Sequence, residues 1–83
     1  MRLIYFAWVR ERIGKPQEDL DLPAGIETVN DLLAWLRSRG EEYEQALKHP
    51  DVIRVAIDQE HVDHDEKIAG AHEIALFPPM TGG

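Results

Sequence analysis

The residues with the clearest chemical potential are the last six of the chain, which read PPMTGG. Gly82 and Gly83 have no Cβ, so they fit a channel too narrow for other residues and accept any backbone angle there. The reactive group of such an end is the terminal carboxylate of Gly83. Pro78 and Pro79 lack amide hydrogens and have a fixed φ, so they end a strand ladder after Phe77 and stiffen the segment beyond it. The pattern predicts an extended, reactive C-terminal tail.

The chemistry open to this tail is activation of its carboxylate. ATP can convert an inert carboxylate to an acyl adenylate, and a sulfur nucleophile can then replace AMP and leave a thiocarboxylate, which is a good sulfur donor. Neither step needs an acid or base from the chain that carries the tail. Residues 78–83 span on the order of 20 Å when extended, enough to enter a deep active site on another protein. An isolated Gly-Gly is more often a passive chain end, but Phe-Pro-Pro directly after a strand favours the reactive tail.

The rest of the chain shows no catalytic constellation. There are no cysteines, which excludes disulfides, thiolate metal sites and a cysteine nucleophile. The only serine, Ser38, lies within a predicted helix and so cannot occupy a nucleophile elbow. His61, Asp63, His64 and Asp65 have metal-ligand chemistry, but they cluster in a polar turn without a distant ligand to complete a set. No metal site and no cofactor bound by this chain are expected.

Composition limits the other possibilities. Eighty-three residues suit one small domain. The formal net charge of −7 argues against nucleic-acid binding, which needs clustered Lys and Arg. The apolar run at residues 3–9 is too short to span a membrane and has no small-residue cleavage site after it. We therefore expect a cytoplasmic protein that binds neither nucleic acid nor membrane.

Five strands and two helices are predicted to position the tail. β-Branched and aromatic residues, bounded by turn signals, predict strands over residues 3–9, 17–23, 52–57, 59–62 and 72–77. Thr28 and Asp31 predict a capping box at the start of a helix, which ends with Gly40 in the left-handed conformation. The helix carries one apolar stripe, formed by Val29, Leu32, Leu33 and Leu36. A weaker second helix is predicted over residues 41–49.

This order of elements predicts the fold. Strands on both sides of one good helix indicate an α+β domain with that helix packed across a mixed sheet, and a β-grasp architecture fits. The first and last strands would then be central neighbours, with Leu76 in the core. Residues 1–77 form the predicted domain and residues 78–83 the tail.

With the tail in view, the sequence resembles the small subunit of molybdopterin synthase, a family of ubiquitin-like β-grasp sulfur carriers. The resemblance covers nearly the whole chain, through LIYFAWVRERIG, TVNDLLAWL, VAIDQEHV and EIALFPPMTGG. The specific motif is Phe-Pro-Pro-x-x-Gly-Gly after a strand, because a bare Gly-Gly also suits ubiquitin or the thiamine-pathway carrier.

The resemblance implies a non-catalytic, sulfur-donating subunit with three partners. A ubiquitin-activating-type adenylyltransferase would use ATP and Mg²⁺ to adenylate Gly83, and a persulfide donor would convert the adenylate to a thiocarboxylate. The tail would then enter the large synthase subunit and give its sulfur to cyclic pyranopterin monophosphate, forming molybdopterin. Two small and two large subunits are the implied assembly, and the large subunit would carry the catalytic side chains.

The resemblance also assigns residues. Gly82 and Gly83 match the reactive end, and the segment inserted into the partner is matched by Pro78, Pro79, Met80 and Thr81. Phe6 and Phe77 align with apolar residues that dock the partners, although Phe6 could equally be a core residue. His61 stands where the family often has an apolar contact residue, which weakens that contact or makes it polar and pH-sensitive.

Two other functions stay open on the sequence. The chain could be a related sulfur carrier for thiamine synthesis or tRNA thiolation. It could also be a β-grasp interaction module whose tail is passive.

Overall fold

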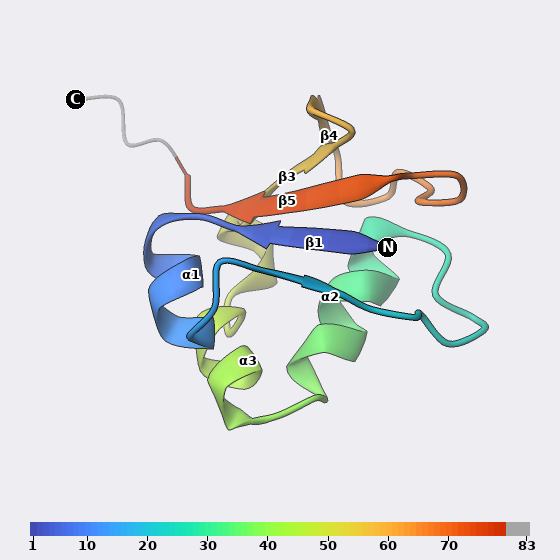
Figure 1. Cartoon of the computed structure of the whole chain (residues 1–83). Helices are drawn as coiled ribbons and strands as arrows, with labels where there is room; N and C mark the ends of the chain where they lie inside the picture. The colour runs from blue at the N-terminus through green and yellow to red at the C-terminus, as the bar shows by residue number, and fades with distance from the viewer. Residues whose placement is uncertain (80–83) are drawn as a thin grey trace.

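A five-stranded mixed sheet forms the centre of the computed structural model, which describes residues 1–79 of the chain. The strands stand in the order β2-β1-β5-β3-β4. Their bounds are β1 Arg2–Tyr5, β2 Gln17–Asp19, β3 Arg54–Ile57, β4 Glu60–Val62 and β5 Glu73–Phe77. β1 and β5 pair in parallel, and the other neighbours are antiparallel. The prediction of a mixed sheet with the first and last strands as central neighbours is confirmed (Figure 1).

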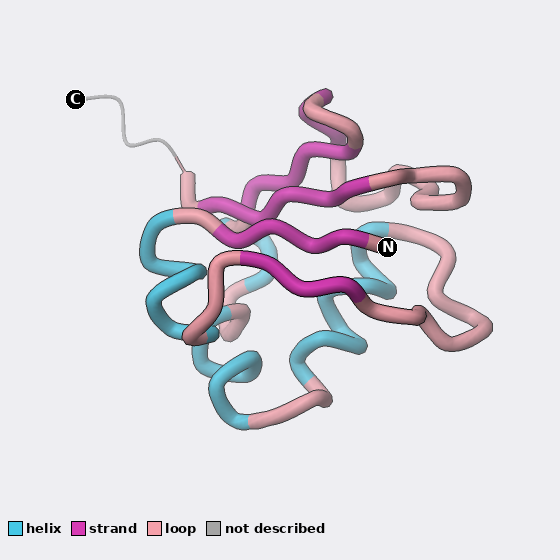
Figure 2. The backbone as a smooth tube through the Cα atoms, in the orientation of Figure 1, coloured by secondary structure: helices cyan, strands magenta, loops and turns pink. Residues whose placement is uncertain are grey.

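The helices cover one face of this sheet, as Figure 2 shows. They are α1 Ala7–Ile13, α2 Val29–Arg37 and α3 Glu41–Ala46, followed by a 3₁₀ turn, η1, at Pro50–Val52. The main helix α2 packs across the sheet, which confirms the α+β class and the β-grasp architecture. None of the helices within residues 1–79 is long and apolar enough to cross a membrane.

The core lies between α2 and the two central strands. Side chains alternate across a strand, so Leu3 and Tyr5 of β1 and Ile74 and Leu76 of β5 all point to the helix side and are buried. The stripe predicted on α2 is fully buried against them: Val29, Leu32, Leu33 and Leu36. Each such side chain contributes about 1.5–3 kcal/mol relative to an exposed position.

The start of α2 agrees with the sequence, but its end does not. The Thr28 hydroxyl accepts the Asp31 backbone N–H at 3.2 Å, and the Asp31 carboxylate accepts the Thr28 N–H at 3.1 Å, so the capping box is confirmed. The helix ends at Arg37 without a left-handed residue. Gly40 has φ 169° and is instead the N-cap of α3, so its predicted left-handed conformation is wrong. The last turn is closed by two hydrogen bonds to carbonyls three residues back, from the Ser38 N–H to Trp35 and from the Arg39 N–H to Leu36, both 3.0 Å.

The first strand is also shorter than predicted. β1 ends at Tyr5, and the apolar residues after it form α1 rather than a continued strand. Ala7, with φ 51°, turns the chain out of the sheet, and Val9 and Ile13 are buried one helical turn apart. Gly14 ends α1 in the left-handed conformation, with φ 93°, and its N–H donates to the Arg10 carbonyl at 2.8 Å. β2 therefore pairs with β1 across a helix rather than across a tight turn.

The second half of the chain contains smaller departures. α3 ends at Ala46, three residues before the predicted end of the second helix, and η1 occupies the start of the predicted strand 52–57. Pro50 fits the first position of η1 because its missing N–H has no partner in a first helical turn.

Candidate functional site

The tail continues from the end of β5, the middle strand of the sheet, which lies between β1 and β3. β1 and β5 are parallel, so both end at the same edge, with Tyr5 beside Leu76. The Phe6 N–H donates to the Leu76 carbonyl at 3.1 Å, and on the other side Phe77 pairs with Arg54 of β3. Pro78 and Pro79 follow and are half-buried. Figure 1 shows that β5 ends beside the start of α1.

Four predicted site residues fall beyond this point. Met80, Thr81, Gly82 and Gly83 lie outside the described residues, so their assignments stay predictions.

The face of the sheet opposite the helices carries a row of small and apolar side chains. The register places Ile4 of β1, Ala75 of β5, Ala56 of β3 and His61 of β4 side by side on this face. The two alanines at the centre leave the row shallow, with larger side chains at its ends. We call this row, together with Phe77, Arg54 and the adjacent Phe6, the open face.

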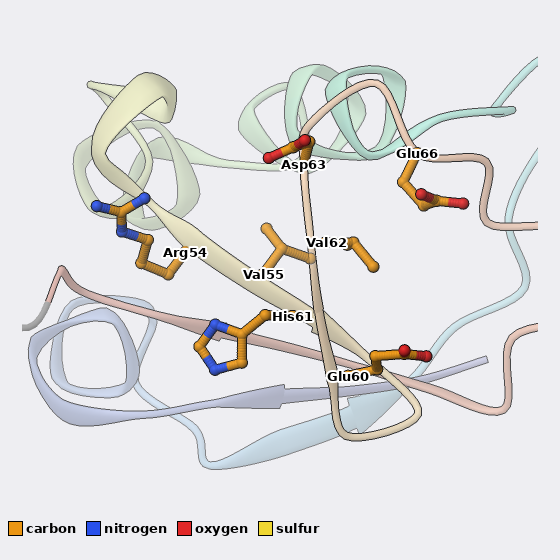
Figure 3. Close-up of a pocket in the computed structure, with 7 residues that line it drawn as sticks. All are labelled: Arg54, Val55, Glu60, His61, Val62, Asp63 and Glu66. Carbon is orange, nitrogen blue, oxygen red and sulfur yellow. The ribbon is translucent and has the colours of Figure 1, made fainter.

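His61 and Phe77, both predicted to dock a partner, meet on the open face. Their rings pack edge to face, with centroids 5.2 Å apart and planes at 71°. His61 is exposed and Phe77 half-buried. Figure 3 shows that the side chains of His61 and Val62 leave β4 on opposite sides, so that Val62 turns to the core side and His61 away from it. The structure thus joins two residues that are 16 positions apart in the sequence.

Phe6 is a surface residue. Its side chain is 46% exposed at the junction of β1 and α1, next to the end of β5. Core packing, the alternative left open by the sequence, is therefore excluded for Phe6.

Sequence reasoning missed Arg54, the first residue of β3. It lies opposite Phe77 and is exposed, and with His61 it lines an open hollow of about 520 Å³ (Figure 3). The alternation Arg54-Val55-Ala56 contained the signal, since it places Arg54 and Ala56 on one face and the buried Val55 on the other. The open face therefore has a cation close to the tail exit.

The polar turn after β4 does not assemble into a metal centre in the described part of the chain. No three potential ligands among residues 1–79 converge closely enough to hold an ion. The imidazole Nε2 of His64 lies 2.7 Å from the Ile53 carbonyl, so this side chain ties the turn to the segment before β3.

A cluster of side-chain hydrogen bonds around Glu18 holds several helices and strands together. The Glu18 carboxylate on β2 accepts hydrogen bonds from the hydroxyls of Tyr5 and Tyr43, both at 2.7 Å, and from Arg39 at 3.1 Å. Burial alone would raise the pKa of Glu18, but these hydrogen bonds outweigh it and lower the pKa. The pKa of the Tyr5 hydroxyl is raised, mainly by burial and also by its hydrogen bond to Glu18. The cluster joins β1, β2, α3 and the end of α2, on the side of the sheet away from the open face.

Comparison with known proteins assigns the chain to a family. Residues 3–83 match the ThiS family model. The chain belongs to the ThiS family. It is 36% identical, over 99% of its length and 94% of the relative's, to a molybdopterin synthase sulfur carrier subunit of Dictyostelium discoideum. It is 29% identical to the subunit of that name from Escherichia coli (strain K12), over 100% of this chain and 99% of the other. The resemblance drawn from the sequence is confirmed.

Solved structures of similar chains share the fold. SAMP1 from Haloferax volcanii superposes with a TM-score of 0.72 at 30% identity, covering 100% of this chain and 98% of the other. A putative molybdopterin converting factor subunit 1 from Pyrococcus furiosus gives a TM-score of 0.72 at 25% identity, with 94% of each chain covered. The ubiquitin-like β-grasp fold is therefore confirmed.

Proposed function

We propose that this chain is the sulfur-carrier small subunit of a molybdopterin synthase. The observation that carries the proposal is the position of Phe77, the residue with which the Phe-Pro-Pro-x-x-Gly-Gly motif begins. Phe77 closes a central strand that has neighbours on both sides, and it packs against His61 on the open face. The strand fixes the start of the tail, so a partner that docks on the open face also receives the tail.

The proposed chemistry takes place at the Gly83 carboxylate. One of its oxygens attacks the α-phosphorus of ATP on an adenylyltransferase, with Mg²⁺ on the nucleotide, and pyrophosphate leaves. A persulfide sulfur then attacks the acyl carbon and AMP leaves. A second thiol attacks the donor's sulfur and breaks the sulfur–sulfur bond, which leaves a thiocarboxylate on Gly83 and a disulfide between the donor and that thiol. Transfer of this sulfur to cyclic pyranopterin monophosphate takes place in the large subunit, with two small and two large subunits in the assembly.

The residues of this chain would supply a docking surface for the partner and a tail that extends into the partner's active site. An apolar row flanked by partly exposed aromatic rings is the kind of surface whose burial stabilises a protein interface. Phe77 and Phe6 are the rings that flank the row on the side of the tail. Pro78 and Pro79 restrict the tail and so reduce the entropy lost when it enters a channel. No acid or base from this chain takes part.

The proposal is tested by pyrophosphate exchange. The purified chain is incubated with the adenylyltransferase, ATP, Mg²⁺ and labelled pyrophosphate, and label entering ATP is measured. We expect exchange with the full chain and none with a chain that lacks Gly83. Equal exchange with both chains would contradict adenylation at this residue.

A second candidate function is protein modification. The observation that favours it is the similarity to small archaeal modifier protein 1 of H. volcanii, at 30% identity and a TM-score of 0.71 over 95% of both chains. A lysine amine, instead of a sulfur nucleophile, would then attack the Gly83 adenylate. Conjugates of higher mass, formed with ATP and absent without Gly83, would favour this function. The absence of a basic residue directly before Gly82 argues against it.

A further inference from the structure

A second hollow lies at the same end of the molecule as the tail exit. It measures about 580 Å³ and is bounded by α1, the end of α3 and η1. α1 follows β1 directly, and η1 leads into β3, whose first residue pairs with Phe77. Both α1 and η1 are therefore directly connected to the strands on either side of β5, from which the tail continues. We call this hollow the basic pocket; its main lining residues are Trp8, Arg12, Ala46, Lys48, His49 and Val52.

The basic pocket combines apolar and cationic surface. Val52 is 40% exposed and Trp8 half-buried, and the buried Ala46 also lines the pocket. The Arg12 guanidinium lies 4.4 Å from the centroid of the Trp8 ring. Lys48 and His49 are exposed at the rim. None of the described residues that line the pocket is a carboxylate.

This lining is unusual for the chain, which has 16 acidic and nine basic residues. Within residues 1–79, neither Arg12 nor Lys48 forms an ion pair. Glu44, one helical turn before Lys48, is held by two hydrogen bonds from Arg37, at 3.0 and 3.1 Å. Glu44 is thus bonded to Arg37, and the positive charge of Lys48 acts on it more weakly. Because neither Arg12 nor Lys48 has an ion-pair partner in the described chain, both can meet an outside anion.

We propose that the basic pocket docks an acidic protein segment on an enzyme that receives the tail. The segment places an apolar side chain against Trp8 and Val52 and directs carboxylates to Arg12 and Lys48. This inference rests on the proposed function, because it assumes that the tail enters a partner. Charges further apart than about 8 Å are largely screened at physiological ionic strength, so the acidic residues that lie far from the pocket contribute little to the contact.

Binding to the adenylyltransferase and to the large synthase subunit tests the proposal. Lys48→Glu places a negative charge at the rim, and Lys48→Arg keeps the positive one. The matched control is Lys67→Glu, which makes the same charge change at an exposed lysine outside the pocket. We expect Lys48→Glu to weaken binding to at least one enzyme by about threefold to tenfold, as for a partly exposed ion pair that becomes repulsive. Lys48→Arg and Lys67→Glu should bind as the unchanged chain does.

Two further measurements define the contact. The loss from Lys48→Glu should shrink at high salt, and Val52→Asp should weaken the same complex. Equal binding of Lys48→Glu and the unchanged chain to both enzymes overturns the inference while leaving the proposed function intact. An unchanged chain that binds neither enzyme overturns both. If deletion of residues 80–83 shifts the Trp8 indole NMR signal of the free chain while that of Trp35 stays in place, the chain's own tail occupies the pocket, and the inference is overturned.

Discussion

At the scale of single residues, Phe77 links the fold to the tail. It is the last residue of β5, pairs with Arg54, and packs its ring against His61 at 5.2 Å. The family resemblance assigned a docking role to Phe77 but left Phe6 undecided, because the strand predicted over residues 3–9 has apolar residues on both faces. The exposure of Phe6 depends on the turn at Ala7, whose positive φ of 51° no local sequence signal announces.

Truncation of Phe77 should weaken partner binding. Phe77→Ala removes a half-buried ring from the open face, and we expect the affinity for the large synthase subunit to fall about tenfold, the size typical of an aromatic contact near an interface centre. Calorimetric titration measures the change. Gln17→Ala, at the exposed edge of the same face, is the control and should bind normally. An undiminished affinity for Phe77→Ala would remove the open face from the docking surface.

At the scale of elements, the strand-to-helix junction was the main feature that the sequence did not predict. The first residues of α1, 7–9, belong to the apolar run that predicted a strand, and only the spacing of Val9 and Ile13, followed by Gly14, indicated a helix. The capping box and stripe of α2 were predictable because both rest on local spacing. The Glu18 cluster was not, since its bonds join residues up to 25 positions apart.

The Glu18 cluster should make stability depend on pH. The pKa of Glu18 is lower in the folded chain than its ordinary value, so its contribution is fully present above that value and is lost as the pH falls through the folded pKa. Glu18→Gln should lower the free energy of unfolding by about 1–2 kcal/mol near neutral pH and flatten its decline in acid. Urea unfolding across pH measures both. Asp19→Asn, the exposed neighbour, is the control, and an equal cost for both variants would contradict the role given to Glu18.

A substitution in the turn between β3 and β4 should make the fold more stable. Asp58 and Gln59 both have positive φ, 48° and 72°, the pattern of a two-residue hairpin turn that favours glycine at its second position. Gln59→Gly should raise the free energy of unfolding by about 0.5–1 kcal/mol, because it relieves the left-handed cost. Thermal unfolding tests this, with Gln59→Ala as the control. Asp58 is best left unchanged, since its carboxylate accepts the N–H groups of His72 and Glu73, each at 2.9 Å. A Gln59→Gly chain no more stable than Gln59→Ala would contradict the prediction.

At the scale of the whole molecule, the proposed function gives the domain and the tail separate tasks. The buried core of the described chain runs from Leu3 to Leu76, ahead of Pro78. The overall fold was predictable because the order of strands and helices allowed few arrangements. The open face could not be predicted from the sequence, because it joins residues of four strands. Their alignment depends on the pairing register, including the parallel contact of β1 with β5.

Removal of the tail should separate folding from function. A chain that lacks residues 80–83 should unfold at the same temperature as the full chain, because the described core lies before them, yet it should fail to carry sulfur. Circular dichroism on heating measures the first property. A large fall in the unfolding temperature would show that these residues help to hold the domain together.

Intact mass spectrometry tests the proposed role of Gly83 as the residue that carries sulfur in a thiocarboxylate. The chain is incubated with ATP, Mg²⁺, the adenylyltransferase and a persulfide donor, and fragmentation then locates any change. We predict a species in which one oxygen of the Gly83 carboxylate is replaced by sulfur, and which disappears when the large subunit and cyclic pyranopterin monophosphate are added. A chain whose mass stays unchanged under these conditions would contradict the claim.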